Sequence, residues 1–192
     1  TEFIMNFLSN LISGLSLGSI YALIALGYTM VYGIAKMLNF AHGDVIMVGA
    51  FTVIVAANSM GLPVVACIGL SVLVCVVMGV LIERIAYKPL RSSPPLSVLI
   101  TAIGVSYFLQ SLALLIFGST QKSFPKVFNM APVHFGELTI KGESIETLVV
   151  TTVIMIGLTL FINKTKMGKA MRAVSEDRAA AELMGISVNK TI

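Results

Sequence analysis

The stretch Pro63–Ile82 reads Pro-Val-Val-Ala-Cys-Ile-Gly-Leu-Ser-Val-Leu-Val-Cys-Val-Val-Met-Gly-Val-Leu-Ile, 20 residues without a charged side chain. A helix of that length is about 30 Å long, which matches the hydrocarbon core of a bilayer. An uncharged apolar stretch of about 18 or more residues is typical of a membrane-spanning helix. This stretch therefore predicts a transmembrane helix.

Uncharged runs of this kind account for most of the chain. They are Phe3–Ala35, Val45–Ile82, Ser92–Gln121 and Thr147–Asn163. The 192-residue chain is 57% hydrophobic and 11% charged, whereas soluble domains carry about 25% charged residues. A fold of this length leaves too much surface in water to hide so much apolar area. We therefore expect an all-α protein, a polytopic transmembrane helix bundle surrounded by lipid.

The runs predict five crossings, one of them irregular. The segment Asn58–Pro63 divides the second run, because its Gly and Pro interrupt helices. The piece before it, Val45–Ala57, has only 13 residues and is too short to cross alone. Extending that piece back to Asn39 gives enough length, but it brings ionisable residues toward the membrane. Such residues usually face a protein interior or a water-filled path.

Basic residues are concentrated in two loops, 83–91 and 164–192, whereas the loop 119–146 balances three Lys with three Glu. Because cytoplasmic loops carry an excess of Lys and Arg, both basic loops are predicted to be cytoplasmic and 119–146 external. Alternating apolar residues around Gly136 predict a short β-hairpin in the external loop. The domain prediction is a transmembrane region, 1–163, followed by a cytoplasmic segment.

The segment Asn39-Phe-Ala-His-Gly-Asp44 is a small polar cluster that opens the irregular crossing. Gly43 permits a break, and Asp44 suits the first turn of a helix, whose N-terminus favours negative charge. Broken helices at membrane depth line cavities and commonly form transporter binding sites. Two interpretations stay open: Asn39, His42, Gly43 and Asp44 form part of a translocation path or gate, or they form an ordinary cytoplasmic turn with a helix cap.

The sequence predicts no enzyme and no metal site. His42 and Asp44 supply two metal ligands at most, and no Ser-His-Asp, Cys-His or paired-carboxylate arrangement stands out. The net charge of +4 follows the two basic loops, so it does not indicate a nucleic-acid partner. Gln110 is a polar side chain within a span, and it either lines a path or bonds to a neighbouring helix.

The last segment predicts a short cytoplasmic helix. Ser175 is expected to be its N-cap, with Asp177 in the first turn. Residues 178–184 are good helix formers, and Gly185 is suited to end the helix. Leu183 and Met184 supply apolar contacts near that end. An amphipathic surface helix and an element that docks to a soluble partner are both consistent with the pattern.

Ala180-Ala181-x-x-x-Gly185 resembles the cytoplasmic loop with which ABC-importer permeases dock into the ATPase subunit, where Glu-Ala-Ala-x-x-x-Gly is typical. Ala179 stands in the position of the Glu. Further motifs extend the resemblance, over essentially the whole chain, to the LivH-type branched-chain amino acid permeases. They are Gly18-Ser-Ile-Tyr-Ala-Leu-Ile-Ala-Leu-Gly27, Leu38-Asn-Phe-Ala-His-Gly-Asp44, Gly49-Ala50, Glu83-Arg84…Tyr87-Lys-Pro-Leu-Arg91, Thr101-Ala-Ile-Gly104 and Gly168…Arg172-Ala173…Asp177…Gly185-Ile186.

The resemblance implies a hydrophobic subunit of an ABC importer for leucine, isoleucine and valine in the bacterial inner membrane. It implies a homologous permease subunit, two ATP-binding cassette subunits that carry ATP and Mg, and an external substrate-binding protein as partners. This chain itself is expected to bind no cofactor, and further C-terminal spans are expected beyond it. The residues expected to couple to the ATPase are Arg172, Asp177, Ala180, Ala181, Gly185 and Ile186.

Three alternatives remain. A same-family permease for urea or short amides is compatible with the quoted motifs, and the specificity of the binding protein separates it from the first reading. A passive membrane channel or a membrane-assembly subunit needs no docked ATPase, so co-purification with a nucleotide-binding subunit separates it. An intramembrane enzyme is disfavoured because the sequence lacks a catalytic pair.

Overall fold

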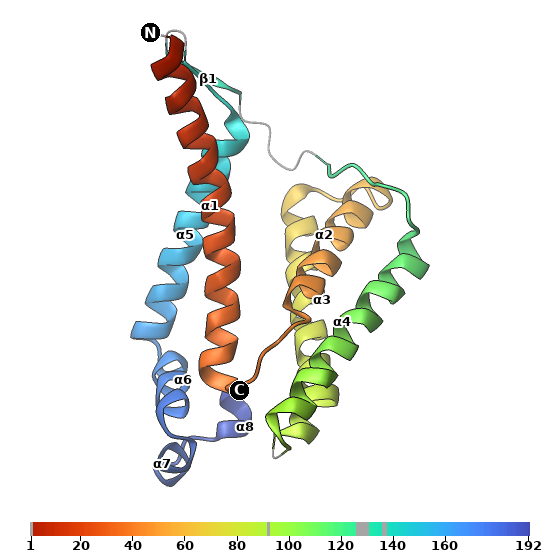
Figure 1. Ribbon diagram of the computed structural model, residues 1–192, viewed down its shortest axis with the longest axis vertical. Coiled ribbons are helices and arrows are strands. Elements are labelled where there is room, and N and C mark those ends of the chain that lie inside the picture. The colour runs from red at the N-terminus through yellow and green to blue at the C-terminus, as the bar shows by residue number, and fades with distance from the viewer. Residues whose placement is uncertain (1, 92, 126–130, 136–137) are drawn as a thin grey trace. The chain divides into compact units, whose positions relative to one another are not determined.

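The computed structural model describes residues 2–91, 93–125, 131–135 and 138–192 of the chain. Most of these residues are helical, as the composition predicts (Figure 1). The elements in order are α1 (Glu2–Ala35), α2 (His42–Asn58), α3 (Val64–Ile82), η1 (Glu83–Tyr87), η2 (Lys88–Leu90), α4 (Pro95–Phe117), β1 (Val133–Phe135), β2 (Leu138–Ile140), α5 (Gly142–Lys164), α6 (Lys166–Glu176), α7 (Arg178–Leu183) and α8 (Val188–Thr191).

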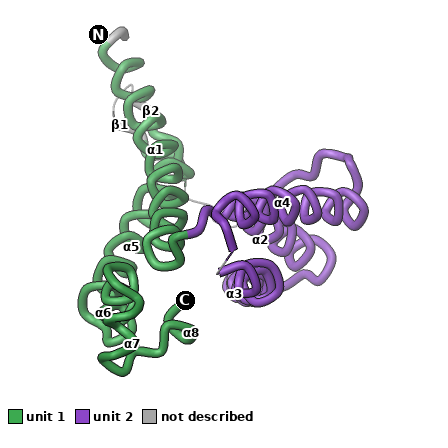
Figure 2. The backbone as a smooth tube through the Cα atoms, turned by 60° about the horizontal axis from the view of Figure 1, so that its bottom comes forward, with its two compact units in different colours: residues 1–36, 128–192 green, residues 37–127 purple. Residues whose placement is uncertain are grey.

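The chain forms two compact units (Figure 2). Unit 1 comprises residues 1–36 and 128–192, and unit 2 comprises residues 37–127. Unit 1 therefore joins the first helix to the last third of the chain, and unit 2 is continuous in sequence. The predicted division into 1–163 and 164–192 concerns sides of a membrane, and it stays a prediction.

Within the described ranges, four helical segments are long and apolar enough to cross a membrane. They are Ile4–Ala35, Val64–Leu90, Pro95–Phe117 and Gly142–Lys164. The predicted fifth crossing corresponds to α2, which has 17 residues and falls among the shorter apolar helices. The count of five is therefore not supported by helix length. The reason is that α2 begins only at His42, so residues 39–41 do not lengthen it.

Large apolar side chains cover the outside of the long helices. Leu115 on α4 is 83% exposed, and Val65 on α3 is 81% exposed. Burying a side chain of this kind is worth about 1.5–3 kcal/mol. Soluble monomers rarely expose contiguous apolar patches of this extent, which mark membrane or protein interfaces. The helices are therefore suited to be covered by lipid and by neighbouring helices.

In unit 2, α2 and α3 approach closely through small residues. A Cβ atom on Gly49 would lie 2.8 Å from Cys75 Sγ and 3.2 Å from Ser71 Oγ. Ser71 Oγ donates to the Gly49 carbonyl at 2.9 Å, and Cys75 Sγ lies 3.6 Å from the Val45 carbonyl oxygen that accepts its bond. Small residues with short polar side chains commonly hold helices together in lipid, where apolar burial between helices gains little.

In unit 1, α1 packs against α5, and two short strands lie near them. The strands pair antiparallel, with Val133 opposite Ile140 and Phe135 opposite Leu138. They occupy the stretch in which the alternating sequence predicts a hairpin, and the connecting residues 136–137 lie outside the described residues. These six residues leave the helical class unchanged.

The corner between α5 and α6 depends on Gly168. Thr165 is the N-cap of α6, and its Oγ1 accepts from the Gly168 N–H at 3.0 Å. A Cβ atom on Gly168 would lie 2.2 Å from the Ile162 carbonyl oxygen, which is a backbone atom and has little room to move. The short connection of α6 to α5 therefore requires a residue without a side chain.

We expect Gly168→Ala to destabilise unit 1 by about 3 kcal/mol, because overpacking against backbone forces the two helices apart. Thermal unfolding of the purified protein in detergent measures the change. Gly157→Ala on α5 is the matched control, since a Cβ atom there meets nothing within 4 Å. Equal unfolding temperatures for the two variants would contradict the close approach.

Candidate translocation path and coupling surface

Asp44 lies in the first turn of α2 and is 7% exposed. Its carboxylate accepts hydrogen bonds from Ser106 Oγ and from Gln110 Nε2, the latter at 3.0 Å, and both donors lie on α4. Gln110 Nε2 also lies 3.1 Å from Ser106 Oγ. A buried carboxylate needs such donors, because an unpaired buried charge costs several kcal/mol. Asp44 therefore ties the start of α2 to the middle of α4.

Asn39 has a different partner from Asp44. Its Oδ1 accepts from the Tyr87 hydroxyl at 3.0 Å, which joins the segment before α2 to η1. Ala41, between the two polar residues, is fully buried in a core cluster. The members of that cluster are Ala41, Ile82, Tyr87, Val98, Ala102 and Leu109. The segment 39–44 is thus held in unit 2 by hydrogen bonds at Asn39 and at Asp44, with the buried Ala41 between them.

The break that Gly43 permits does not occur at Gly43 itself. Gly43 is the second residue of α2, and a Cβ atom there would meet nothing within 4 Å. The helical path is interrupted earlier, after α1, where Lys36 has a positive φ of 54°. His42 begins α2 and is half-buried. The structure therefore places the four candidate path residues in one segment but gives Asn39 and Asp44 separate partners.

Sequence reasoning singled out Asp44 and Gln110 but missed Ser106 and Tyr87. Ser106 and Gln110 are spaced i, i+4 on α4, which places them on one helix face. That spacing is the signal that was present in the sequence. Of the two roles left open for Gln110, the bond to a neighbouring helix is confirmed.

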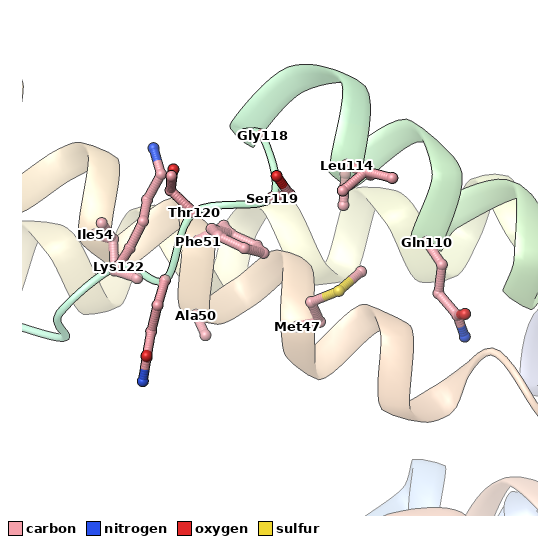
Figure 3. Close-up of a pocket in the computed structure, with 12 residues that line it drawn as sticks. Met47, Ala50, Phe51, Ile54, Gln110, Leu114, Gly118, Ser119, Thr120 and Lys122 are labelled. Carbon is pink, nitrogen blue, oxygen red and sulfur yellow. The ribbon is translucent and has the colours of Figure 1, made fainter.

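A pocket of about 440 Å³ lies in unit 2 and includes Gln110 in its wall (Figure 3). Its apolar side comes from α2 and α4, and its polar side comes from the residues just after α4. The lining residues are Met47, Ala50, Phe51, Ile54, Gln110, Ala113, Leu114, Gly118, Ser119, Thr120, Gln121 and Lys122. Such a mixed lining suits a small molecule with one polar and one apolar end.

A pair of stacked rings and a cation–ring contact lie beside this pocket. The rings of Phe51 and Phe117 stack with centroids 4.2 Å apart, and the Lys122 ammonium lies 5.9 Å from the Phe117 centroid. The attraction between a cation and an aromatic face steadies the Lys122 side chain. Among the described residues, no group of three or more His, Cys, Asp or Glu side chains is placed to hold a metal ion.

The predicted cytoplasmic helix forms as α7, but its start differs from the prediction. Asp177, not Ser175, is the N-cap, and its Oδ1 accepts from the N–H groups of Ala179 at 2.8 Å and Ala180 at 3.1 Å. Ser175 belongs to α6, where its Oγ donates to the Arg172 carbonyl. The reason is that Asp177 adopts extended backbone angles, so the helix begins after it.

The end of α7 confirms the prediction for Gly185. This residue has a φ of +83°, a conformation that glycine adopts at little cost. Its N–H donates to the Glu182 carbonyl at 2.9 Å, and the Ile186 N–H donates to the Ala181 carbonyl at 3.0 Å. This pair of bonds is a Schellman motif, which satisfies carbonyls left open at a helix end. The short helix is therefore capped at both ends.

The two faces of α7 differ in burial. Ala181 is 3% exposed and packs with Val174 of α6 and Val188 of α8. Leu183 and Met184 are 89% and 83% exposed. Ala181 is therefore a packing residue of unit 1, and the neighbouring Leu183–Met184 pair forms the outward surface, which we call the α7 apolar tip.

The remaining predicted coupling residues lie around this helix. Ile186 packs against the cluster that holds Ala181, and Ala180 is exposed. Arg172 lies one helix earlier, on α6, where its guanidinium donates to Asn163 Oδ1 at 3.5 Å. The predicted set is thus brought into one part of unit 1, but only some of its members reach the surface.

Residues 10–192 match the family described as branched-chain amino acid transport system / permease component. The chain belongs to this family. One relative of the chain is the high-affinity branched-chain amino acid transport system permease protein BraD of Pseudomonas aeruginosa. It is 42% identical over an alignment of 202 residues, which covers 98% of this chain and 66% of BraD. No solved structure matches the chain.

Two relatives named LivH extend the comparison. The high-affinity branched-chain amino acid transport system permease protein LivH of Escherichia coli K12 is 42% identical over an alignment of 205 residues, which covers 100% of this chain and 66% of LivH. A probable branched-chain amino acid transport permease protein LivH of Methanocaldococcus jannaschii is 32% identical over 181 residues, 90% of this chain and 56% of the relative. The chain thus spans about two thirds of the length of the bacterial permeases.

Proposed function

We propose that this chain supplies the membrane-spanning part of an ATP-driven importer that brings leucine, isoleucine and valine into a bacterial cell. Membership in the permease family supports the transport role, and the names of the relatives support the substrate. The observation that carries the ATP-driven part is α7: a short, doubly capped helix with one face buried and an exposed α7 apolar tip. A passive channel has no need for such an element.

The proposed topology places residues 83–91 and 164–192 in the cytoplasm and 119–146 outside the inner membrane. The excess of basic side chains in the first two segments supports this assignment. We assign α2 as a fifth, short crossing that is shielded from lipid by protein. A buried carboxylate near its start supports that assignment, because charged groups at membrane depth face a protein interior or a water-filled path.

In this proposal, Asn39, His42, Gly43 and Asp44 form a gate element of the translocation path. The bonds from Asp44 to α4 hold one arrangement of the gate. A gate must have a second arrangement in which different contacts are made, because a ligand shifts an equilibrium only through differential contacts. The external binding protein and the ATPase subunits supply those differences.

The proposed partners are a homologous permease subunit, two ATP-binding cassette subunits that hold ATP and Mg, and an external substrate-binding protein. The ATPase subunits bind the α7 apolar tip, since exposed apolar pairs on a rigid element are typical interface anchors. Asp177 and Gly185 fix the shape of that element through its two caps. Ala181 and Ile186 fasten it to unit 1.

The test is affinity purification of the full-length protein from native membranes, followed by uptake of labelled leucine and labelled urea by the purified assembly in liposomes. Nucleotide-binding subunits in the purified assembly and ATP-dependent leucine uptake are expected. Uptake of urea but not leucine would overturn the proposed substrate. Transport without ATP and without a nucleotide-binding subunit would overturn the importer itself.

A further inference from the structure

Lys36 follows α1 directly, but no basic side chain lies within the last turn of this helix. The last carbonyl groups of a helix have no partner inside it, and they form the negative end of the helix dipole. Lysine or arginine in the last turn commonly compensates, yet the last turn of α1 contains no basic residue. The Arg178 guanidinium brings a second cation to this helix end from 143 residues away: its Nη2 donates to the carbonyl oxygen of Ala35, the final residue of α1.

Arg178 is also the first residue of α7. The same side chain therefore joins two helix ends, the start of the element with the exposed tip and the end of the first membrane helix. Asp177, immediately before it, already fixes the start of α7 by capping two N–H groups. Because the backbone on both sides of the contact is helical, a displacement of α7 acts on α1 without an intervening flexible loop.

An apolar contact accompanies the polar one. Ile34, next to Ala35, packs against the cluster of Val174, Ala181 and Val188. A pocket of about 140 Å³ lies among α1, α5 and α6, with Gly33, Ile34 and Arg172 in its wall. Ile34 and Ala35, at the carboxyl end of α1, thus both contact the segment that contains α6, α7 and α8.

The chain itself connects α1 to the candidate gate. Lys36 follows α1 with a φ of +54°, and α2 starts six residues later at His42. A shift of the end of α1 therefore has a covalent route, through the short non-helical segment 36–41, to Asn39 and Asp44.

We infer that Arg178 is a positioning residue that fastens α7 to the carboxyl end of α1, so that a pull on the α7 apolar tip reaches the gate segment through α1. This inference rests on the proposed function, because it assumes that an ATPase subunit moves α7. It assigns the transmission to a named contact that lies outside the motif residues Ala180, Ala181 and Gly185.

The experiment uses the full-length permease assembled with its ATPase subunits in liposomes. The measured quantity is the leucine imported per ATP hydrolysed, for the wild type, R178A and R178K. R178A is expected to lower this ratio about tenfold, which lies within the usual range for coupling between sites. R178K is expected to recover part of the ratio, because an ammonium group still donates to a carbonyl but lacks the planar fork.

The matched control is K169A, which removes an exposed cation from α6 and is expected to leave the ratio unchanged. A merely structural role for Arg178 would reduce the amount of assembled transporter and its ATP hydrolysis together, leaving the ratio as in the wild type. An unchanged ratio in R178A, with or without loss of assembled protein, therefore overturns the inference.

Amide hydrogen exchange supplies a readout that does not depend on transport. R178A is expected to speed exchange at residues 32–36 and in α7, while K169A leaves both as in the wild type. If the wild-type assembly fails to import leucine, the proposed function is overturned. Amide hydrogen exchange then remains as the test of the contact between Arg178 and the end of α1. Unchanged exchange in R178A then overturns the inference independently.

Discussion

Replacing both Leu183 and Met184 by aspartate should abolish ATP-dependent leucine uptake in the assembled transporter. The two side chains are 89% and 83% exposed, so the change leaves the packing of unit 1 intact. Losing a central apolar anchor of an interface costs about 2–4 kcal/mol, and each 1.4 kcal/mol weakens binding tenfold. We therefore expect ATPase subunits to be lost from the purified assembly, with uptake at background.

The control for this prediction introduces two carboxylates elsewhere on the same part of unit 1. Lys166 and Lys169 are both exposed on α6, and their replacement by aspartate adds the same negative groups away from the α7 apolar tip. The control is expected to retain most of the ATPase subunits. Normal assembly and uptake in the Leu183–Met184 variant would show that another surface receives the ATPase.

The second large effect is expected for Asp44. Asp44→Ala removes the acceptor of both Ser106 and Gln110, and hydrogen bonds to a charged group are worth about 1.5–3 kcal/mol. We expect unit 2 to lose about 2 kcal/mol of stability and leucine uptake to fall at least tenfold. Thermal unfolding in detergent and uptake in liposomes measure the two effects separately.

Asp44→Asn separates the charge from the hydrogen bonds, because an amide oxygen still accepts from Ser106. If the contact matters only for packing, this variant keeps most of the stability and uptake. If the negative charge itself takes part in transport, stability is kept and uptake is lost. Wild-type behaviour of Asp44→Ala in both measurements would exclude a role for this carboxylate in the gate.

The helices were predictable from the absence of charge, since lipid is the only environment that suits such long apolar runs. The predicted span Pro63–Ile82 becomes α3, Val64–Ile82, with Pro63 as its N-cap. The predicted run Thr147–Asn163 is longer in the structure, because α5 begins at Gly142. The first turn of α5 includes Glu143, whose negative charge is favourable at a helix N-terminus. The prediction took the run to begin after the last charged residue, so it left out this turn.

The candidate site was only partly predictable. Asp44 stood out because an ionisable residue adjoins an apolar run, but its partner Ser106 lies 62 residues away in sequence. A contact of that separation depends on how α2 and α4 pack, and no local pattern specifies it. The contact of Arg178 with the Ala35 carbonyl was equally unpredictable. The acceptor is a backbone atom, so the residue type at position 35 does not indicate the bond.

Helix order has a consequence for biosynthesis. Unit 1 pairs α1 with α5, and roughly a hundred residues are synthesised between the two helices. At about 5–20 residues per second, α1 emerges roughly 5–20 s before its neighbour exists. Throughout that interval the surface of α1 that packs against α5 in the folded unit lacks this neighbour. The nascent first helix must therefore be sheltered by lipid or by the insertion machinery while the continuous middle unit folds ahead of it.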